Sequence, residues 1–115
     1  MKKQSKLYLE DILVCIQRIR IVADKGQDTF YRDFILQDSI VRNFTNIGEA
    51  LKQIDPELLE GDADFSWKGY VRFRDVLVHQ YDTINMVTVW TTVQEELTPL
   101  EERIKALLAK LDQKS

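Results

Sequence analysis

Apolar residues recur every three or four positions along most of this chain, which is the spacing of an α-helix with one buried face. The first such stripe consists of Leu9, Ile12, Ile16, Ile19 and Ala23. Val14, Ile21 and Val22 are expected to widen it. Gly26 is expected to end this helix, because glycine adopts the backbone conformation that follows a helix C-terminus at little cost. A short helical piece is then predicted over residues 29–34.

A second long stripe with the same spacing consists of Ile40, Phe44, Ile47, Leu51 and Ile54. It should end at Asp55, because the residue before a proline is pushed out of the helical region, and Pro56 follows. Residues 60–63 are expected to form a loop. A third helix should begin near Asp64 or Ser66 and continue at least to residue 78.

The last third of the chain predicts two helices separated at a proline. Asn85 is a candidate N-cap for a fourth helix, whose apolar positions are Met86, Trp90, Val93 and Leu97. Residues 98–101 (Thr-Pro-Leu-Glu) have the form of a capping box with proline at the first helical position. A last helix should begin there, and residues 112–115 should be frayed. No segment has the alternation of a strand, so the pattern predicts an all-α bundle of four to five helices.

Length and composition narrow the class of protein. The 115 residues are enough for a single domain over residues 1–115. No apolar run approaches the roughly 18 residues that span a membrane. The Met-Lys-Lys start is not followed by an apolar segment, which argues against a secretory signal. Cys15 is the one cysteine and is expected to be buried and inert. These features favour the cytoplasm and give no sign of a membrane partner.

The net charge of −3 bears on possible partners. A dedicated nucleic-acid binder usually has a basic face, so this value argues against tight, non-specific RNA binding by a monomer. It leaves room for a small basic cleft, because Lys68, Arg72 and Arg74 lie in one short stretch. A dimer would bring two such stretches close together.

That stretch also contains the one histidine of the chain, in the order Arg74-x-x-x-x-His79-x-Tyr81. Histidine exchanges protons near neutral pH, and arginine is a permanent cation suited to phosphate. The pair therefore suggests acid–base chemistry on a phosphodiester. Arg74 and Tyr81 would share one helix face, whereas Arg74 and His79 would diverge by about 140°. Either the helix breaks near His79, or a second copy of the chain completes the site.

Each of these residues also has a plainer interpretation. His79 could be a solvated side chain on a polar face, and Arg74 could bridge to an acidic residue of a neighbouring helix. Asp75 could pair with His79, four residues later, or with Arg72, three residues earlier, as neighbours on a helix do. Glu49 could form an ion pair, and Gly48 is expected to allow two helices to pack closely. One histidine and one cysteine cannot form the usual zinc site, and no glycine-rich phosphate loop is present.

The order of these residues resembles the HepT-like toxins, a branch of the HEPN ribonuclease superfamily. The resemblance covers most of the chain. Besides the motif itself, it rests on Ile47-Gly48-Glu49-Ala50, Trp67, Val89-Trp90 and Leu97-Thr98-Pro99-Leu100. It implies a HEPN-like helical bundle and a homodimer in which the two motifs line one cleft. It also implies an endoribonuclease that needs no metal or other cofactor.

The resemblance further implies roles for individual residues. His79 would act as general base or acid in the attack of the RNA 2′-hydroxyl on the neighbouring phosphate, and Arg74 would stabilise the developing charge. Asp75 would orient His79. The partner would be a minimal nucleotidyltransferase antitoxin that transfers AMP to Tyr81, so that the chain is the toxin of a toxin–antitoxin pair.

Two alternatives remain open at this point. The chain could be a non-catalytic dimeric interaction module that binds a nucleotidyltransferase or a nucleotide, which the acidic net charge favours. A plain structural helical bundle is the weaker alternative.

Overall fold

The computed structural model of the chain describes residues 2–61 and 65–114, and within them it contains α-helices, one 3₁₀ turn and no strand. Four long helices account for most of these residues: α1 (Lys2–Ala23), α3 (Phe34–Gln53), α5 (Trp67–His79) and α6 (Met86–Lys114). Three short elements connect them: α2 (Gln27–Arg32), α4 (Pro56–Glu60) and η1 (Tyr81–Thr83). The predicted all-α bundle is confirmed.

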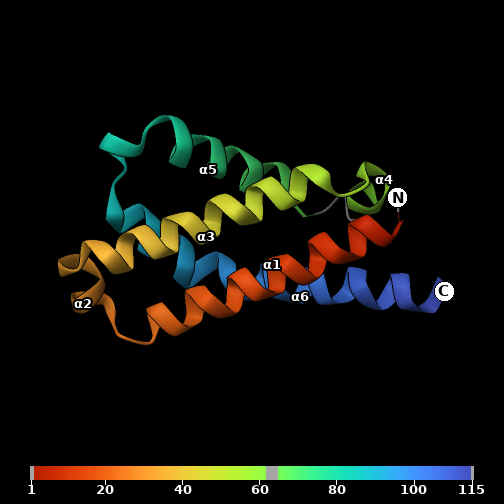
Figure 1. The fold of residues 1–115 in the computed structure, drawn as a ribbon, viewed down its shortest axis with the longest axis horizontal. Helices are drawn as coiled ribbons and strands as arrows, with labels where there is room; N and C mark the ends of the chain where they lie inside the picture. The colour runs from red at the N-terminus through yellow and green to blue at the C-terminus, as the bar shows by residue number, and fades with distance from the viewer. Residues whose placement is uncertain (1, 62–64, 115) are drawn as a thin grey trace.

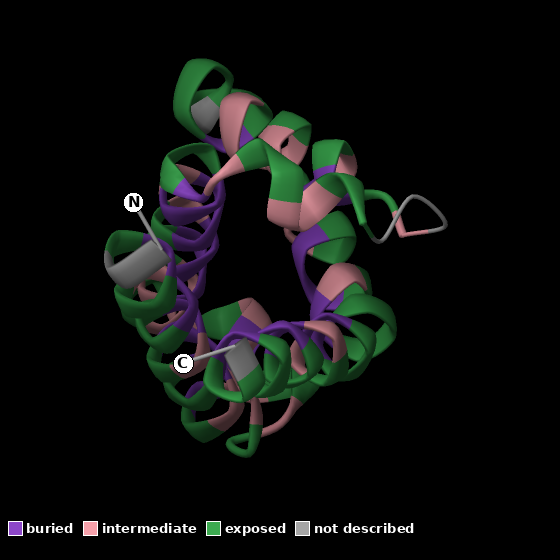
Figure 2. Cartoon of the chain, turned by 90° about the vertical axis from the view of Figure 1, so that its right-hand side faces the viewer, coloured by how far each residue is buried: buried purple, intermediate pink, exposed green. Residues whose placement is uncertain are grey.

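The long helices run side by side along the 46 Å axis of the molecule (Figure 1). Helix α1 packs against both α3 and α6, and α5 packs on the other side of α3. An end-on view shows the buried residues turned toward the middle of the bundle and the exposed ones turned outward (Figure 2). Helix α5, which carries the motif, is therefore positioned mainly by α3.

The apolar stripe of α1 is buried as predicted, because Leu9, Ile12, Ile16 and Ile19 are all fully inaccessible to solvent. The expectation that Val14 and Ile21 widen it is wrong, since these side chains are 48% and 65% exposed. Together with Leu7, which is 60% exposed, they follow a seven-residue spacing. At 100° per residue this spacing places all three on the helix face opposite the core.

The turn after α1 differs from the prediction by two residues. Gly26 has a φ of +96°, in the region that favours glycine, and it directly precedes α2. Helix α2 therefore spans residues 27–32 instead of 29–34. It ends early because Asp33 caps the next helix: its Oδ1 accepts a hydrogen bond of 2.9 Å from the backbone N–H of Ile35.

Helix α3 buries its predicted stripe and ends at Gln53, in agreement with the effect expected of Pro56. The chain does not continue as a loop, however. Pro56 begins α4, and the carboxylate of Asp55 accepts a 3.1 Å hydrogen bond from the N–H of Glu57. A capping aspartate followed by proline is a helix start signal. Of the residues 60–63 predicted to form a loop, Glu60 is the last residue of α4 and Gly61 is its C-cap, whereas Asp62 and Ala63 lie outside the described residues.

The two predicted C-terminal helices are one helix of 29 residues, α6, with Pro99 inside it. Asn85 does cap its start, since Asn85 Oδ1 accepts a 2.8 Å hydrogen bond from the N–H of Val87. Proline removes the helical hydrogen bond to the carbonyl four residues earlier, here that of Glu95. Both residues are exposed, so water can reach that carbonyl. Leu97 and Leu100 are buried on either side, which favours a continuous helix over a break.

Contacts with α1 hold α6 on both sides of Pro99. Arg20 donates hydrogen bonds to Thr98 Oγ1 at 3.2 Å and to Glu101 Oε1 at 2.7 Å. Glu101 therefore binds Arg20 instead of closing the predicted capping box, and this hydrogen bond holds the pKa of its carboxyl below the usual range. The helix continues to Lys114, so the prediction of a frayed tail is wrong for residues 112–114.

Aromatic side chains fill the junction between α5 and α6. The rings of Phe65 and Tyr70 stack at 5.7 Å, and the Tyr70 hydroxyl donates a 3.0 Å hydrogen bond to Glu96 Oε1. Burial, followed by this contact with Glu96, raises the pKa of Tyr70. Trp67 and Trp90 are both buried. Cys15 is also buried, which raises the pKa of its thiol.

No helix in the described part of the chain is long and apolar enough to cross a membrane.

Candidate active site

The site begins with a close contact between two helices. Gly48 of α3 lies directly under Arg74 of α5, and a Cβ atom added at Gly48 would overlap Arg74 Cβ and lie 2.7 Å from its Cγ. No other residue type leaves this space empty. The predicted role of Gly48 in close helix packing is confirmed, and the residue it accommodates is the arginine of the motif.

The guanidinium of Arg74 lies among charged side chains from both helices. Its Nη2 forms an ion pair with Glu49 Oε1, and its Nη1 donates a 2.9 Å hydrogen bond to Asp75 Oδ1. Lys52 Nζ donates to the same Asp75 oxygen at 3.3 Å. The hydrogen bond from Arg74, with a further contribution from Lys52, lowers the pKa of Asp75. These four residues, which we call the charge cluster, carry two positive and two negative charges.

Exposure distinguishes the members of the charge cluster. The side chain of Arg74 is 18% exposed, whereas those of Glu49 and Asp75 are each 45% exposed. Arg74 Nε is buried and has no hydrogen-bond partner within residues 2–61 and 65–114. Glu49 Oε1, the oxygen that pairs with Arg74 Nη2, is also buried, so this ion pair lies within the contact between α3 and α5 although the Glu49 side chain as a whole is partly exposed.

His79 is the last residue of α5 and is exposed. The N–H of Gln80 still bonds to the carbonyl of Val76 at 2.9 Å, and the chain then enters η1. A shallow hollow of about 350 Å³ beside it is lined by Val78, His79, Gln80, Asp82 and Thr83. The imidazole is thus accessible to a ligand from solution.

The structure does not bring Arg74 and His79 together within one chain. Helix α5 continues unbroken through His79, so a break before the histidine, which would have reoriented it, is not present. Among the described residues, no hydrogen bond or ion pair joins His79 to Arg74 or to Asp75. The predicted pairing of Asp75 with His79 is replaced by the pairing of Asp75 with Arg74 and Lys52.

Tyr81 lies beyond the end of α5, in the 3₁₀ turn η1. The prediction that it shares a helix face with Arg74 is therefore wrong, because that argument required the helix to continue to Tyr81. The side chain of Tyr81 lies outside the part of the molecule that the structure describes.

The family-level comparison agrees with these observations. A family model described as "Ribonuclease HepT-like" matches residues 12–107. The chain belongs to the HepT-like ribonuclease family. This match extends from α1 to the last turns of α6 and includes every residue of the charge cluster and His79.

Individual relatives of the chain are also named as ribonucleases. The chain is 34% identical over 109 residues to a protein named "Putative RNase" from Caldanaerobacter subterraneus, covering 94% of the chain and 97% of the relative. It is 29% identical over 111 residues to a "Probable ribonuclease HepT" from Thermococcus cleftensis, covering 93% and 98%.

A third relative is longer than this chain. It is a "Gamma-glutamylcyclotransferase and putative RNase" from Methanocaldococcus jannaschii, 33% identical over 113 residues. The match covers 97% of the chain but spans about half, 51%, of that relative. No solved structure matches the chain at a comparable level of significance.

Two members of the charge cluster of this HepT-like chain were not predicted as site residues. The sequence suggests an ion pair for Glu49 and gives no indication of a role for Lys52. Both lie on α3, three residues apart, and they reach the motif only because Gly48 allows α5 to approach. A glycine followed by a glutamate on a helix opposite the motif is the signal that could have identified them.

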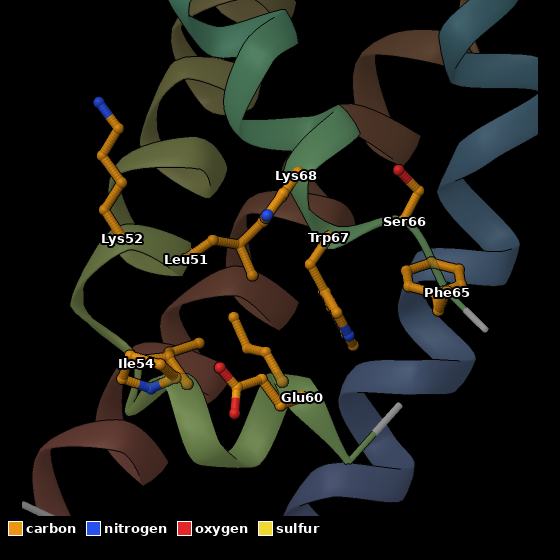
Figure 3. Close-up of a pocket in the computed structure, with 10 residues that line it drawn as sticks. Leu51, Lys52, Ile54, Glu60, Phe65, Ser66, Trp67 and Lys68 are labelled. Carbon is orange, nitrogen blue, oxygen red and sulfur yellow. The ribbon is translucent and has the colours of Figure 1, made fainter. Parts of the chain in front are cut away.

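A larger hollow lies away from the motif, between α4 and the start of α5. It has a volume of about 630 Å³ and a mostly apolar lining that includes Leu51, Ile54, Leu59, Phe65 and Trp67 (Figure 3). Lys52 stands at its edge and extends away from the apolar side chains (Figure 3). Lys52 is the member of the charge cluster that borders this hollow, whereas Arg74, Asp75 and His79 are not among its lining residues. The candidate active site is therefore the charge cluster together with His79.

The described residues contain no group of three or more His, Cys, Asp or Glu side chains that could hold a metal ion.

Proposed function

We propose that this chain is a metal-independent endoribonuclease. One observation carries the proposal: an arginine built into the contact between α3 and α5 is followed, five residues later, by an exposed histidine at the end of the same helix. Guanidinium groups bind phosphate oxygens through their N–H groups, and imidazole transfers protons near neutral pH. The family to which the chain belongs supports RNA as the substrate.

RNA supplies its own nucleophile in this mechanism. The 2′-hydroxyl attacks the adjacent phosphorus, the bond from phosphorus to the 5′-oxygen breaks, and a 2′,3′-cyclic phosphate and a 5′-hydroxyl result. His79 removes the proton from the 2′-hydroxyl or delivers one to the leaving oxygen. Arg74 stabilises the negative charge that develops on the phosphoryl oxygens. The proposed role of Asp75 is to hold Arg74 in position, which its 2.9 Å hydrogen bond with Arg74 supports.

The proposed active form is a homodimer. Arg74 and His79 point about 140° apart on a continuous helix, so one chain does not direct both at the same phosphate. Val76 and Val78 lie between them and are each 42% exposed, which gives α5 an apolar surface that a second copy could cover. Light scattering on the purified protein tests this proposal: a mass of one chain at tens of micromolar would contradict it.

The proposed biological role is that of a toxin silenced by a nucleotidyltransferase antitoxin, with Tyr81 as the AMP acceptor. The position of Tyr81 supports this part of the proposal, because the residue lies two positions after His79, in the turn beside the shallow hollow. A phosphate group attached there would bring negative charge next to the histidine and would oppose the approach of an RNA phosphate.

The test of the nuclease itself is cleavage of RNA in the presence of EDTA, comparing the chain with its His79→Ala variant. The second candidate function is a non-catalytic module that docks a nucleotidyltransferase or binds a nucleotide. The neutral charge cluster and the net charge of −3 favour this candidate. Equal cleavage by wild type and His79→Ala, with both proteins folded, would contradict the catalytic proposal and leave the module.

A further inference from the structure

Glu49 occupies the part of Arg74 that a phosphate would need. The guanidinium Nη2 is already paired with the Glu49 carboxylate, and Nη1 with that of Asp75. Carboxylate and phosphate oxygens bind the same guanidinium N–H groups in similar geometry, so they compete for them. Because Nη1 and Nη2 are each paired with a carboxylate and Nε is buried, each nitrogen of the guanidinium is either paired or buried before an RNA phosphate arrives.

The two carboxylates on Arg74 differ in how firmly they are held. Asp75 follows Arg74 in α5 and binds a second cation, Lys52, at 3.3 Å. Glu49 comes from α3, has a longer side chain, and is paired with Arg74. Its side chain is 45% exposed, so rotation away from Arg74 would bring its carboxylate into water. Glu49 is therefore the carboxylate that an RNA phosphate would replace at lower cost.

The surroundings provide a place for the released side chain. Glu49 also lines a groove of about 660 Å³ between α1 and α3, together with polar residues that include Arg18, Asn46 and Gln53. A carboxylate that turns from Arg74 into this groove remains near a positive charge and hydrogen-bonding groups. The exchange thus does not leave a buried charge without a partner.

We infer that Glu49 is the resident anion of the Arg74 site: it holds the guanidinium in place before substrate arrives, and an RNA phosphate displaces it. This inference rests on the proposed function and identifies a positioning residue for it. It also accounts for the neutral charge cluster, because the positive charge of Arg74 becomes available only when Glu49 leaves.

The experiment measures binding separately from cleavage. An RNA oligonucleotide with 2′-O-methyl groups cannot be cleaved by its own 2′-oxygen, and its dissociation constant is measured by fluorescence anisotropy at fixed salt. Glu49→Gln preserves the size of the side chain and removes its charge. Glu101→Gln is the matched control, because Glu101 also pairs with an arginine, Arg20, but lies on the α1–α6 contact. Both variants change the net charge equally.

Glu49→Gln is expected to bind the oligonucleotide roughly twofold to fivefold more tightly than Glu101→Gln, which corresponds to the loss of one partly exposed competing ion pair. In an Arg74→Gln background the same substitution should give no such gain. Circular dichroism checks that each variant is folded. A purely structural Glu49 would lower the thermal stability without tightening binding.

Equal dissociation constants for Glu49→Gln and Glu101→Gln would overturn the inference, and so would the absence of binding by all variants. Cleavage of an unmodified RNA is scored on the same proteins. Cleavage with equal binding would remove the inference and leave the nuclease. Tighter binding by Glu49→Gln without any cleavage would support the inference and contradict the nuclease.

Discussion

Arg74 fills the space that a side chain at Gly48 would occupy, so the motif arginine and the glycine of α3 form one interlocking contact. The contact sets the position of the motif helix relative to α3. It also brings Glu49 and Lys52 of α3 close enough to form ion pairs with Arg74 and Asp75, respectively. The geometry of the charge cluster thus depends on the absence of one Cβ atom.

Gly48→Ala should destabilise the protein, because the added methyl group overlaps Arg74 Cβ and the two helices must separate. The expected loss is about 1–3 kcal/mol in the free energy of unfolding, as for other overpacked helix contacts. Gly61→Ala is the control: its Cβ would meet its nearest neighbour, Leu58 O, at 3.5 Å, an ordinary contact. Urea denaturation of both variants measures the difference. Equal stability of the two would show that α5 shifts without cost.

His79→Ala should lose RNA cleavage by about 10²–10⁴-fold, the usual contribution of a general acid or base, while its stability stays near that of wild type. The reason for unchanged stability is that His79 is exposed at the end of α5. Arg74→Ala should also abolish cleavage but should reduce stability, because it removes a mostly buried side chain that packs on Gly48 of α3. Initial cleavage rates with EDTA present, together with thermal unfolding, separate these two effects. Full activity of either variant would exclude that residue from the chemistry.

Tyr81→Phe should remain folded and active as a nuclease but escape silencing by a cognate nucleotidyltransferase with ATP. Phenylalanine keeps the ring and removes the hydroxyl that would accept AMP. Intact-mass measurement after co-expression is the direct readout, with Tyr70→Phe as a control whose hydroxyl is bound to Glu96. Wild type and the control should gain one or more AMP units and Tyr81→Phe none. An equal gain by all three would place the acceptor elsewhere.

Pro99→Ala should stabilise the protein by roughly 1–2 kcal/mol. Alanine restores the N–H that can bond to the carbonyl of Glu95, and alanine is about 3 kcal/mol more favourable than proline within a helix. The greater freedom of the unfolded chain without proline offsets part of this gain. Differential scanning calorimetry measures the shift in melting temperature. A lower melting temperature would mean that the proline shapes a bend in α6 that its contacts with α1 require.

The core of this fold could be predicted from the sequence because it depends on periodicity alone. The stripes of α1 and α3 predicted which residues are buried, with the exception of Val14 and Ile21, which lie on the opposite face of the same helix. A helix start was wrongly predicted at Pro99, because residues 98–101 have the sequence of a capping box. The tertiary contacts of Leu97, Leu100 and Glu101 outweigh that signal.

Only those residues of the candidate site that lie within one short sequence motif could be predicted. The motif predicted Arg74 and His79 as site residues, since an arginine that can bind phosphate and a histidine that can exchange protons lie five residues apart. The partners of Arg74 depend instead on which residues of α3 face α5, and periodicity does not specify that register. Asp75 illustrates the difference: the helical spacing predicts His79 or Arg72 as its partner, yet it binds Arg74 and, across the helix contact, Lys52.

Helix α5 has a small share of the core for its length. Trp67, Tyr70 and Leu77 are its buried residues, whereas α3 buries eight. A segment with fewer buried apolar contacts has a smaller free energy of local opening. Helix α5 should therefore open more readily than α3. Any ligand that binds Arg74 or His79 would add its binding energy to this weakly anchored helix and slow its amide hydrogen exchange. Arg74 and His79 thus lie on a segment whose conformational equilibrium a ligand can shift readily.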